Sequence, residues 1–379
     1  MALNADRLSR TFVALCEIDS PSKGEGKLSL FLQDLFRGLG ADRIFADGSA
    51  PLTGSDCGNL VVRFAGSRSD AEALFFNCHL DVIHPCAGVK VRRIGDQFSS
   101  AGNTVLGADD KAGIAILIEV LTSLREEKRP FPPVEFIFTT CEEIGLRGAK
   151  AFDPLSLTAR YGYALDSTGI DNVIVGAPAS CAITAEIHGL AAHAGLRPQH
   201  GINAIHLAAQ AVARLQLGQL DADTTANIGL ITGGTATNII PDYARVDGEV
   251  RSHNLLTLQA TIAHFQMVFA DVVAGWHDPA HLISTLPSLV FAAPEQYPLM
   301  DLAVDNPAVV RARLAAASLG RSLRFIKAGG GSDANIFNAA GLATAILGIG
   351  MENVHSTSEN ILLPDMLRTA ELVSSLITC

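Results

Sequence analysis

Hydrophobic residues recur along the chain with two periods, which indicate strands that alternate with helices. Residues 74–80 and 134–140 are short apolar runs bounded by polar turns, as in buried strands. Residues 112–129, between them, have the pattern of a helix with a basic carboxyl end. A further helix is expected from about Gly145, followed by a strand at 161–165. This alternation predicts an α/β fold with a mostly parallel sheet flanked by helices on both faces.

The pattern changes near residue 179 and changes back near residue 295. In between, residues 181–189 alternate like a half-exposed strand and residues 201–217 form an amphipathic pattern. Strand-like runs at 226–232 and 243–251, a helix at about 255–275 and a strand ending near Phe291 follow, and then helices at 307–319 and 364–378. The β-α-β-β-α-β order predicts an α+β domain, 179–294, inserted into a discontinuous domain made of 1–178 and 295–379.

Composition limits the kinds of partner and the cellular compartment that we expect for this protein. The chain has 379 residues, of which 48% are hydrophobic, and a net charge of -11. Such an acidic surface repels phosphate backbones and anionic lipids, so neither nucleic acid nor a membrane is expected as a partner. The amino-terminal residues do not resemble a signal peptide, and no apolar run reaches the ~18 residues that span a bilayer. Seven scattered cysteines without a CxxC pair favour a reducing, cytoplasmic location.

Chemistry-bearing residues follow the predicted strands. In CHLDVI, His79 and Asp81 point to the same side of a strand end, so Asp81 can orient the imidazole while His79 offers its other nitrogen to a metal. Taken alone, this motif more often belongs to a hydrogen-bonded loop histidine than to a metal ligand. In LGADDKAG, Asp109 and Asp110 precede a helix. One acid is enough for an N-cap, whereas a bridging carboxylate would explain the second.

Three further motifs lie where predicted strands end. In FTTCEEIG, Glu142 and Glu143 diverge, so that one can bind metal while the other acts as a base, although a solvated helical turn would also contain such a pair. Asp166 and His355 follow two other strands. Ligands of open α/β sheets collect at the carboxyl ends of strands. Two histidines and three acids without a thiolate suit Zn²⁺, Co²⁺ or Mn²⁺.

Taken together, these motifs resemble the metallopeptidase family of peptidase T, carboxypeptidase G and aminoacylase. HLD, GADDKAG, CEEIG, Asp166 and His355 match in order and spacing over essentially the whole chain, and GGGSDANIFNAAGLAT resembles the peptidase T-like branch. The resemblance implies that His79 and Asp166 hold one metal and that Glu143 and His355 hold the other. It also implies that Asp109 bridges the two, that Glu142 is the general base and that the Asp109–Asp110 bond is cis.

The resemblance also assigns roles in the insert, which would be a lid and dimerisation domain. His193 in HGLAAHAG matches a substrate-contacting histidine that acts across a homodimer, although a surface histidine would look the same. Asn238 and Arg251 match substrate-binding positions. Peptidase T carries an arginine where this chain has Gly329, and Arg324 or Lys327 would have to replace it.

The expected function is therefore that of a two-metal hydrolase, a peptidase T-like aminopeptidase that releases the first residue of short peptides such as tripeptides. An N-acyl-amino-acid or acetylornithine-like deacylase, or a dipeptidase, would use the same site. A nucleotide-binding protein is disfavoured because no G-x-x-x-x-G-K-[ST] motif occurs. A catalytically inactive binding paralogue is disfavoured because every ligand position and Glu142 are filled.

Overall fold

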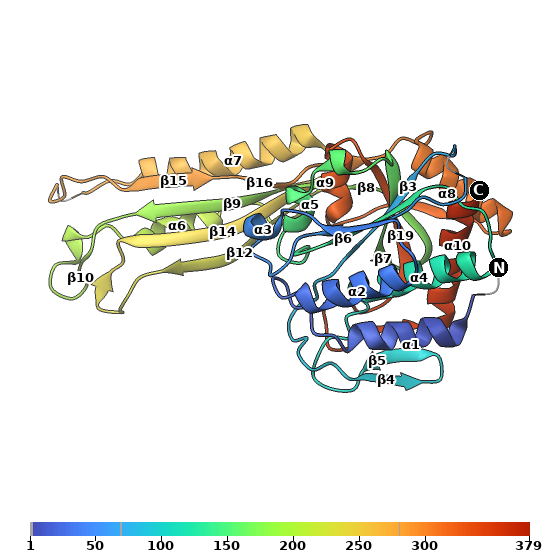
Figure 1. Cartoon of the computed structure of the whole chain (residues 1–379). Coiled ribbons are helices and arrows are strands. Elements are labelled where there is room, and N and C mark those ends of the chain that lie inside the picture. The colour runs from blue at the N-terminus through green and yellow to red at the C-terminus, as the bar shows by residue number, and fades with distance from the viewer. Residues whose placement is uncertain (1–2, 69, 280) are drawn as a thin grey trace. The chain divides into compact units, whose positions relative to one another are not determined.

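The computed structural model describes residues 3–68, 70–279 and 281–379, whose helices and strands are drawn in Figure 1. Contacts divide the chain into two compact units. The first combines the residues up to Ala177 with those from Met300 onward, and the second runs from Pro178 to Leu299. The insert expected from the sequence, 179–294, lies within the second unit.

The first unit is built on a mixed sheet. Its strands are β1 (Arg43–Ala46), β2 (Leu60–Phe64), β3 (Leu74–His79), β6 (Val134–Thr139), β7 (Tyr161–Thr168), β8 (Ile170–Ala177), β17 (Met300–Asp301), β18 (Arg324–Lys327) and β19 (Ala343–Met351). The order is β1-β2-β6-β3-β7-β19-β8-β17, with β18 also on β8. The central strands β6, β3, β7 and β19 are parallel, and β2 and β8 on either side are antiparallel to them. The mostly parallel sheet predicted from the sequence is confirmed.

Helices cover both faces of this sheet. They are α1 (Ala5–Cys16), α2 (Gly26–Gly38), α3 (Ala50–Thr53), α4 (Ala108–Glu126), α5 (Arg147–Ala151), the 3₁₀ turn η1 (Pro154–Ser156), α8 (Pro307–Ser318), α9 (Asp333–Ala339) and α10 (Leu363–Thr378). Residues of α1, α2, α4, α8 and α10 share one core with Leu74, Phe76 and Cys78 of β3. Residues of α5 and α9 share another with Phe75. Because alternate β3 side chains face the two cores, apolar residues lie on both faces of the strand, as in strands that are covered on both sides.

A small sheet lies beside this core. It consists of β4 (Val91–Ile94), β5 (Gln97–Ser100) and β20 (Asn360–Leu362), in the order β20-β5-β4. The β20 strand follows the segment that carries His355, so its pairing with β5 fixes one end of that segment.

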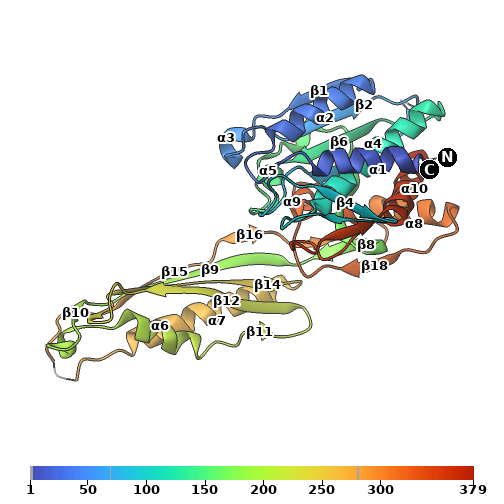
Figure 2. The same ribbon diagram turned by 90° about the horizontal axis from the view of Figure 1, so that it is seen from below.

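The second unit is an antiparallel sheet with two helices. Its elements are β9 (Ala179–His188), β10 (Ala192–His193), η2 (Pro198–His200), α6 (Ala204–Val212), β11 (Gly218–Gln219), β12 (Thr224–Gly233), β13 (Ile239–Ile240), β14 (Tyr243–Ser252), α7 (Leu255–Ala274), β15 (Ser288–Ala292) and β16 (Glu295–Tyr297). The main strands follow the order β11-β12-β14-β9-β15. Both helices lie on one face of the sheet (Figure 2), where they pack on Ala185 and Ile187 of β9. The predicted α+β insert is thus confirmed.

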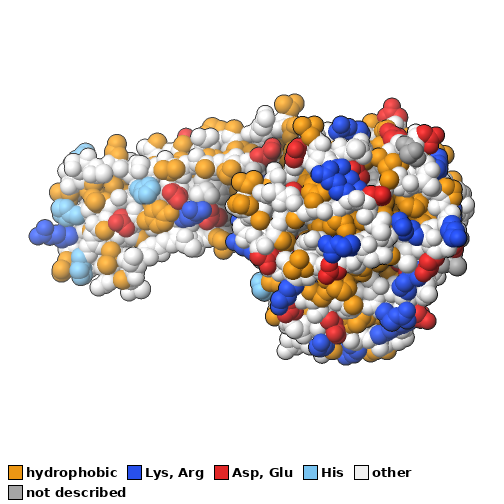
Figure 3. Space-filling model, in the orientation of Figure 1, with side chains coloured by type: hydrophobic (Ala, Val, Ile, Leu, Met, Phe, Trp, Pro, Cys, Tyr) orange, Lys and Arg blue, Asp and Glu red, His pale blue; other side chains and the backbone are white. Residues whose placement is uncertain are grey.

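Helix α7 carries apolar residues on its exposed side as well as on its buried side. Among the described residues, α7 is the one helix that is long and apolar enough to cross a membrane by length and composition, with 28% of its most apolar window buried. Its Phe265 and Phe269 are buried against the sheet, while Leu256 and Met267 are exposed. Figure 3 shows hydrophobic side chains among polar ones on the visible surface of this unit, and interspersed acidic and basic side chains on that of the first.

Candidate metal centre

The ends of four strands bring the predicted ligands to one edge of the large sheet. His79 is the last residue of β3 and is paired with Thr139 at the end of β6, just before Glu142 and Glu143. Asp166 lies near the end of the neighbouring β7, and His355 follows β19. Because these strands are parallel, their carboxyl ends meet, as expected for a ligand site in an α/β sheet.

The ligand atoms form two groups that share Asp109. The first group consists of His79, Asp109 and Asp166, and the second of Asp109, Glu143 and His355. Within each group, the possible ligand atoms all lie within 4.8 Å of one another. Asp109 Oδ1 is 2.9 Å from His79 Nε2, and Asp109 Oδ2 is 3.4 Å from His355 Nε2. One carboxylate therefore presents a different oxygen to each group, as a carboxylate that bridges two cations can.

The two adjacent aspartates have separate tasks. Both have non-helical backbone angles at the start of α4, and the peptide bond between them is cis, as the resemblance implied. Asp109 belongs to both ligand groups. The buried Asp110 instead accepts a hydrogen bond from the backbone N–H of His79 at 3.2 Å. The second acid thus supports the strand end that carries His79.

Asp81 orients His79 through its backbone rather than through its side chain. The Nδ1–H of His79 donates to the carbonyl oxygen of Asp81 at 2.9 Å, whereas Nδ1 is 3.7 Å from the carboxylate. This contact leaves Nε2 as the lone-pair nitrogen that faces Asp109. The Asp81 carboxylate accepts hydrogen bonds from the backbone N–H groups of Glu142 and Glu143, at 2.9 and 3.2 Å, and from Ser22 Oγ at 2.6 Å.

A tight turn after β6 presents Glu142 and Glu143. Cys141 has a positive φ of 55°, and its backbone N–H donates to the buried carboxylate of Glu25 at 2.9 Å. The turn is closed by bonds from Gly145 and Leu146 to the Glu142 carbonyl. Glu143 Oε2 lies 3.0 Å from His355 Nε2. The turn therefore places one acid in a ligand group while its neighbour remains available for another role.

The site concentrates buried carboxylates that cations would stabilise. Burial raises the pKa of Asp166 well above its usual range, and nearby carboxylates add to the shift. Burial, with repulsion from Asp166 and Asp333, does the same to the pKa of Glu142. Hydrogen bonds to Asp109 and Glu143 raise the pKa of His355 to about 10. Among the described residues, Glu143 Oε1 is a buried atom with no hydrogen-bond partner. Divalent ions would neutralise these crowded carboxylates, and imidazole with carboxylate ligands fits Zn²⁺, Co²⁺ or Mn²⁺.

The three residues predicted in the insert fall into two places. His193 in β10 pairs with Ile239 of β13, and the Ala194 N–H donates to the Asn238 carbonyl at 2.9 Å, so the exposed His193 and Asn238 lie together. Arg251 lies near the other end of β14, where it donates to Glu249 at 2.9 Å. It is eight residues from Tyr243, at the end of β14 beside this pair, or about 27 Å along a strand.

Sequence reasoning missed the acids that hold the ligand-bearing loops. Glu25 supports the turn of Glu142, and Glu359 accepts hydrogen bonds from the loop of Asp109. Both side chains are buried. Glu359 belongs to the motif that contains His355, so its place was visible in the sequence, but its partners lie some 250 residues away.

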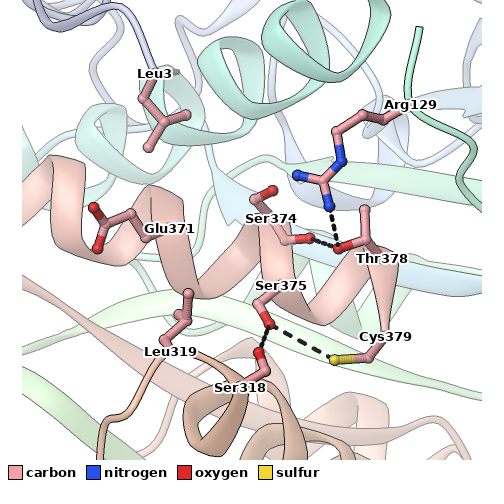
Figure 4. A pocket seen from close by; sticks show the side chains of 9 residues that line it. All are labelled: Leu3, Arg129, Ser318, Leu319, Glu371, Ser374, Ser375, Thr378 and Cys379. Carbon is pink, nitrogen blue, oxygen red and sulfur yellow. Dashed lines mark hydrogen bonds between the residues drawn. The ribbon is translucent and has the colours of Figure 1, made fainter. Parts of the chain in front are cut away.

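A separate hollow of about 560 Å³ lies between α8 and α10. Figure 4 shows Arg129, Glu371 and several hydroxyl side chains around it. None of the nine residues that line this hollow is a predicted site residue. This hollow is therefore separate from the candidate metal centre at the edge of the large sheet.

Two family models match parts of the chain. A model described as "Peptidase dimerisation domain" matches residues 175–277, and one described as "Peptidase family M28" matches residues 59–209. The chain is 36% identical over 376 residues to the Bacillus subtilis protein YqjE, covering 99% of this chain and 98% of that protein. It is 23% identical over 423 residues to peptidase T of Escherichia coli, covering 97% of each.

Solved structures agree over nearly the full length. The aminopeptidase PepT from Bacillus cereus is 36% identical to this chain with a TM-score of 0.89, and covers 99% of this chain and 98% of its own. A tripeptidase from Staphylococcus aureus is 34% identical with a TM-score of 0.92 and the same coverage. The similarity thus extends over both units.

Proposed function

We propose that this chain, which belongs to the peptidase T-like branch of the M20 metallopeptidases, is an aminopeptidase that removes the first residue of short peptides, tripeptides among them. The observation that carries this proposal is the pair of ligand groups joined by the two oxygens of Asp109. It is supported by the names of the two structural relatives, an aminopeptidase and a tripeptidase, which match over almost the whole chain.

In this proposal five side chains hold two divalent ions. His79 and Asp166 would hold one ion, Glu143 and His355 the other, and Asp109 would bridge them. We propose Zn²⁺, with Co²⁺ or Mn²⁺ as substitutes, because the donors are imidazole and carboxylate. Bound there, the ions would supply the Lewis acidity that makes water a nucleophile near neutral pH and polarises the scissile carbonyl.

Glu142 is the proposed general base. It takes a proton from the attacking water and returns it to the amine that leaves, so it acts first as base and then as acid. The Asp81 carboxylate receives the backbone N–H groups of Glu142 and Glu143 and so holds the base and a ligand on one support.

His193 is the proposed donor to the oxyanion. Its Nδ1 accepts hydrogen bonds from the backbone N–H groups of Gly195 and Leu196, at 3.2 and 3.1 Å. This leaves the proton of the neutral ring on Nε2, which is exposed and can donate to the carbonyl oxygen as negative charge develops on it. Asn238, beside it, and Arg251 are the proposed substrate-binding residues.

We further propose a homodimer formed through the second unit. Arg251 lies about 27 Å along β14 from Tyr243, the end of the strand beside His193 and Asn238, so the two ends of one insert could contact two different substrate molecules. Two surfaces are available for association. In the described residues β11 pairs only with Thr225 and Ala226, which leaves the outer edge of the rest of β12 without a strand, and α7 exposes Leu256 and Met267.

Subunit exchange tests the dimer. His193→Ala and Glu142→Gln homodimers should each be nearly inactive, and mixing them should restore activity, because one of the two sites then has both residues intact. The recovered rate should approach half of the wild-type rate per dimer. If verified heterodimers remain inactive, His193 does not act across subunits.

The activity itself is tested with metal-free protein and a matched peptide panel. Exhaustive chelation should abolish hydrolysis, and Zn²⁺, Co²⁺ or Mn²⁺ should restore it. Tripeptides with a free amine should be cleaved and their N-acetylated forms should not. Full activity without metal would refute the metal centre, and cleavage of only acetylated substrates would identify a deacylase instead.

A carboxyl-amidated tripeptide tests the carboxylate contact. Peptidase T has an arginine where this chain has Gly329, and Arg324 and Lys327 lie on the edge strand β18. If either replaces that arginine, amidation should raise KM, and Arg324→Gln or Lys327→Gln should abolish the difference between the two peptides. Equal KM values for the free acid and the amide would show that the enzyme does not bind the terminal carboxylate of the peptide.

We also propose a cytoplasmic location for the enzyme. All seven cysteines are free thiols, and five of them are buried. Unpaired cysteines of this number are typical of proteins kept in a reducing compartment.

A further inference from the structure

The buried carboxylate of Glu359 joins two loops that each carry a proposed ligand. Its Oε2 accepts hydrogen bonds from the backbone N–H groups of Leu106 and Gly107, both at 2.8 Å. Its Oε1 accepts one from the N–H of Asp109 at 2.9 Å. Only 1% of Glu359 is exposed, so these donors replace the water that a carboxylate otherwise binds.

Glu359 also belongs to the loop of His355. This loop is closed at its base by two backbone hydrogen bonds between Glu352 and Asn360, at 2.9 and 3.0 Å. Asn353 and His355 within it have positive φ angles of 52° and 61°. The His355 side chain is 54% exposed, so its position depends on the backbone of the loop more than on packing around the ring.

We infer that Glu359 is a positioning residue that ties the His355 loop to the Asp109 loop and so sets the distance between these two ligands. The inference rests on the proposed function. A carboxylate suits the task because each oxygen can accept from the backbone of the Asp109 loop, and hydrogen bonds to a charged acceptor are the stronger kind. A glutamine has one acceptor oxygen, so its NH₂ group would face at least one backbone N–H without a bond.

The expected effect is unequal at the two ions. His355 belongs only to the group with Asp109 and Glu143, so loosening its loop should weaken that ion first. Loss of a partner that orients a ligand typically lowers metal affinity by about 10- to 100-fold. We expect this loss for one ion in Glu359→Gln and a change of only a few-fold for the ion held by His79 and Asp166.

The control is Glu352→Gln, which removes an exposed acid from the same loop and keeps its backbone bonds. Apoproteins of wild type and both variants are titrated with Zn²⁺ against a competing chelator, at a temperature where circular dichroism shows all three folded. Wild type and Glu352→Gln should bind two ions with the same affinities. Glu359→Gln should bind one ion normally and the other about 10- to 100-fold more weakly, and excess Zn²⁺ should restore most of its kcat.

Each alternative result has a distinct meaning. Normal binding of both ions by Glu359→Gln, or equal weakening of both, would overturn the positioning role. Failure of wild type to bind two ions would refute the proposed function instead. If Glu359→Gln does not fold, the same titration is made with Glu359→Asp, which keeps the charge but is one methylene shorter, and selective weakening of one ion is again the required result.

Discussion

Replacing Glu142 by glutamine tests whether this residue is a general base or a metal ligand, because the change only exchanges one carboxylate oxygen for an amide nitrogen. The backbone N–H of Glu142 would still donate to Asp81 at 2.9 Å, so the turn after β6 should keep its shape. The variant loses the carboxylate that takes up a proton. Loss of a general base lowers the rate by about 10²–10⁴-fold, which corresponds to about 2.7–5.4 kcal/mol of barrier.

The neighbouring residue provides the matched control. Glu143 Oε2 lies 3.0 Å from His355 Nε2 and belongs to a ligand group, so Glu143→Gln should lose an ion. Both substitutions change a carboxylate to an amide in adjacent residues of one turn. The assay measures kcat on a tripeptide together with the metal content of the purified proteins.

The opposite pattern of metal content would refute this assignment. Atoms of His79, Glu142 and Glu143 also lie within 4.8 Å of one another, so distance alone permits Glu142 to bind an ion. We expect Glu142→Gln to retain two ions while its kcat falls. If it loses an ion and Glu143→Gln does not, Glu142 is the ligand and Glu143 the base.

Three further changes test other parts of the structure. His355→Ala should lose one ion of the two by metal analysis, since His355 is in one ligand group. Asp81→Asn should lower kcat/KM by about 10- to 100-fold, because an amide can receive fewer of the N–H groups of the Glu142 turn than a carboxylate, at about 1.5–3 kcal/mol for a hydrogen bond to a charged group. Arg7→Met should destabilise the protein by about 3 kcal/mol in urea unfolding, because it strands the buried Glu119, and adding Glu119→Leu should recover much of the loss.

The sequence was sufficient for the fold and for the side chains that the structure gathers into the two candidate ligand groups. Strand ends could be located because the apolar runs are short and are followed by polar turns, and parallel strands bring such ends together. The helix expected at 201–217 is shorter, at Ala204–Val212, because Asn203 caps its start and the chain turns before β11. The apolar character of α7 was also underestimated, since its length and composition reach the membrane-spanning range.

The buried acids that hold the ligand-bearing loops in place could not be predicted in the same way. Glu25 and Glu359 act on backbone N–H groups that are far away in sequence, and every residue type has such a group, so no motif marks the partner. The same is true of Asp81, where the sequence suggested a carboxylate facing His79. The structure assigns that contact to the backbone carbonyl and gives the carboxylate to Glu142 and Glu143.

The position of β19 has a consequence for how the protein is made. This strand lies between β7 and β8, in the middle of the large sheet, yet the whole second unit is translated before it. Until β19 is made, β7 and β8 lack the strand that lies between them in the folded sheet, while the insert emerges from the ribosome as its own unit. His355, which follows β19, is the last proposed ligand to leave the ribosome. A chain arrested before β19 would carry an open sheet and an incomplete metal centre, which makes such fragments natural substrates for chaperones and proteases.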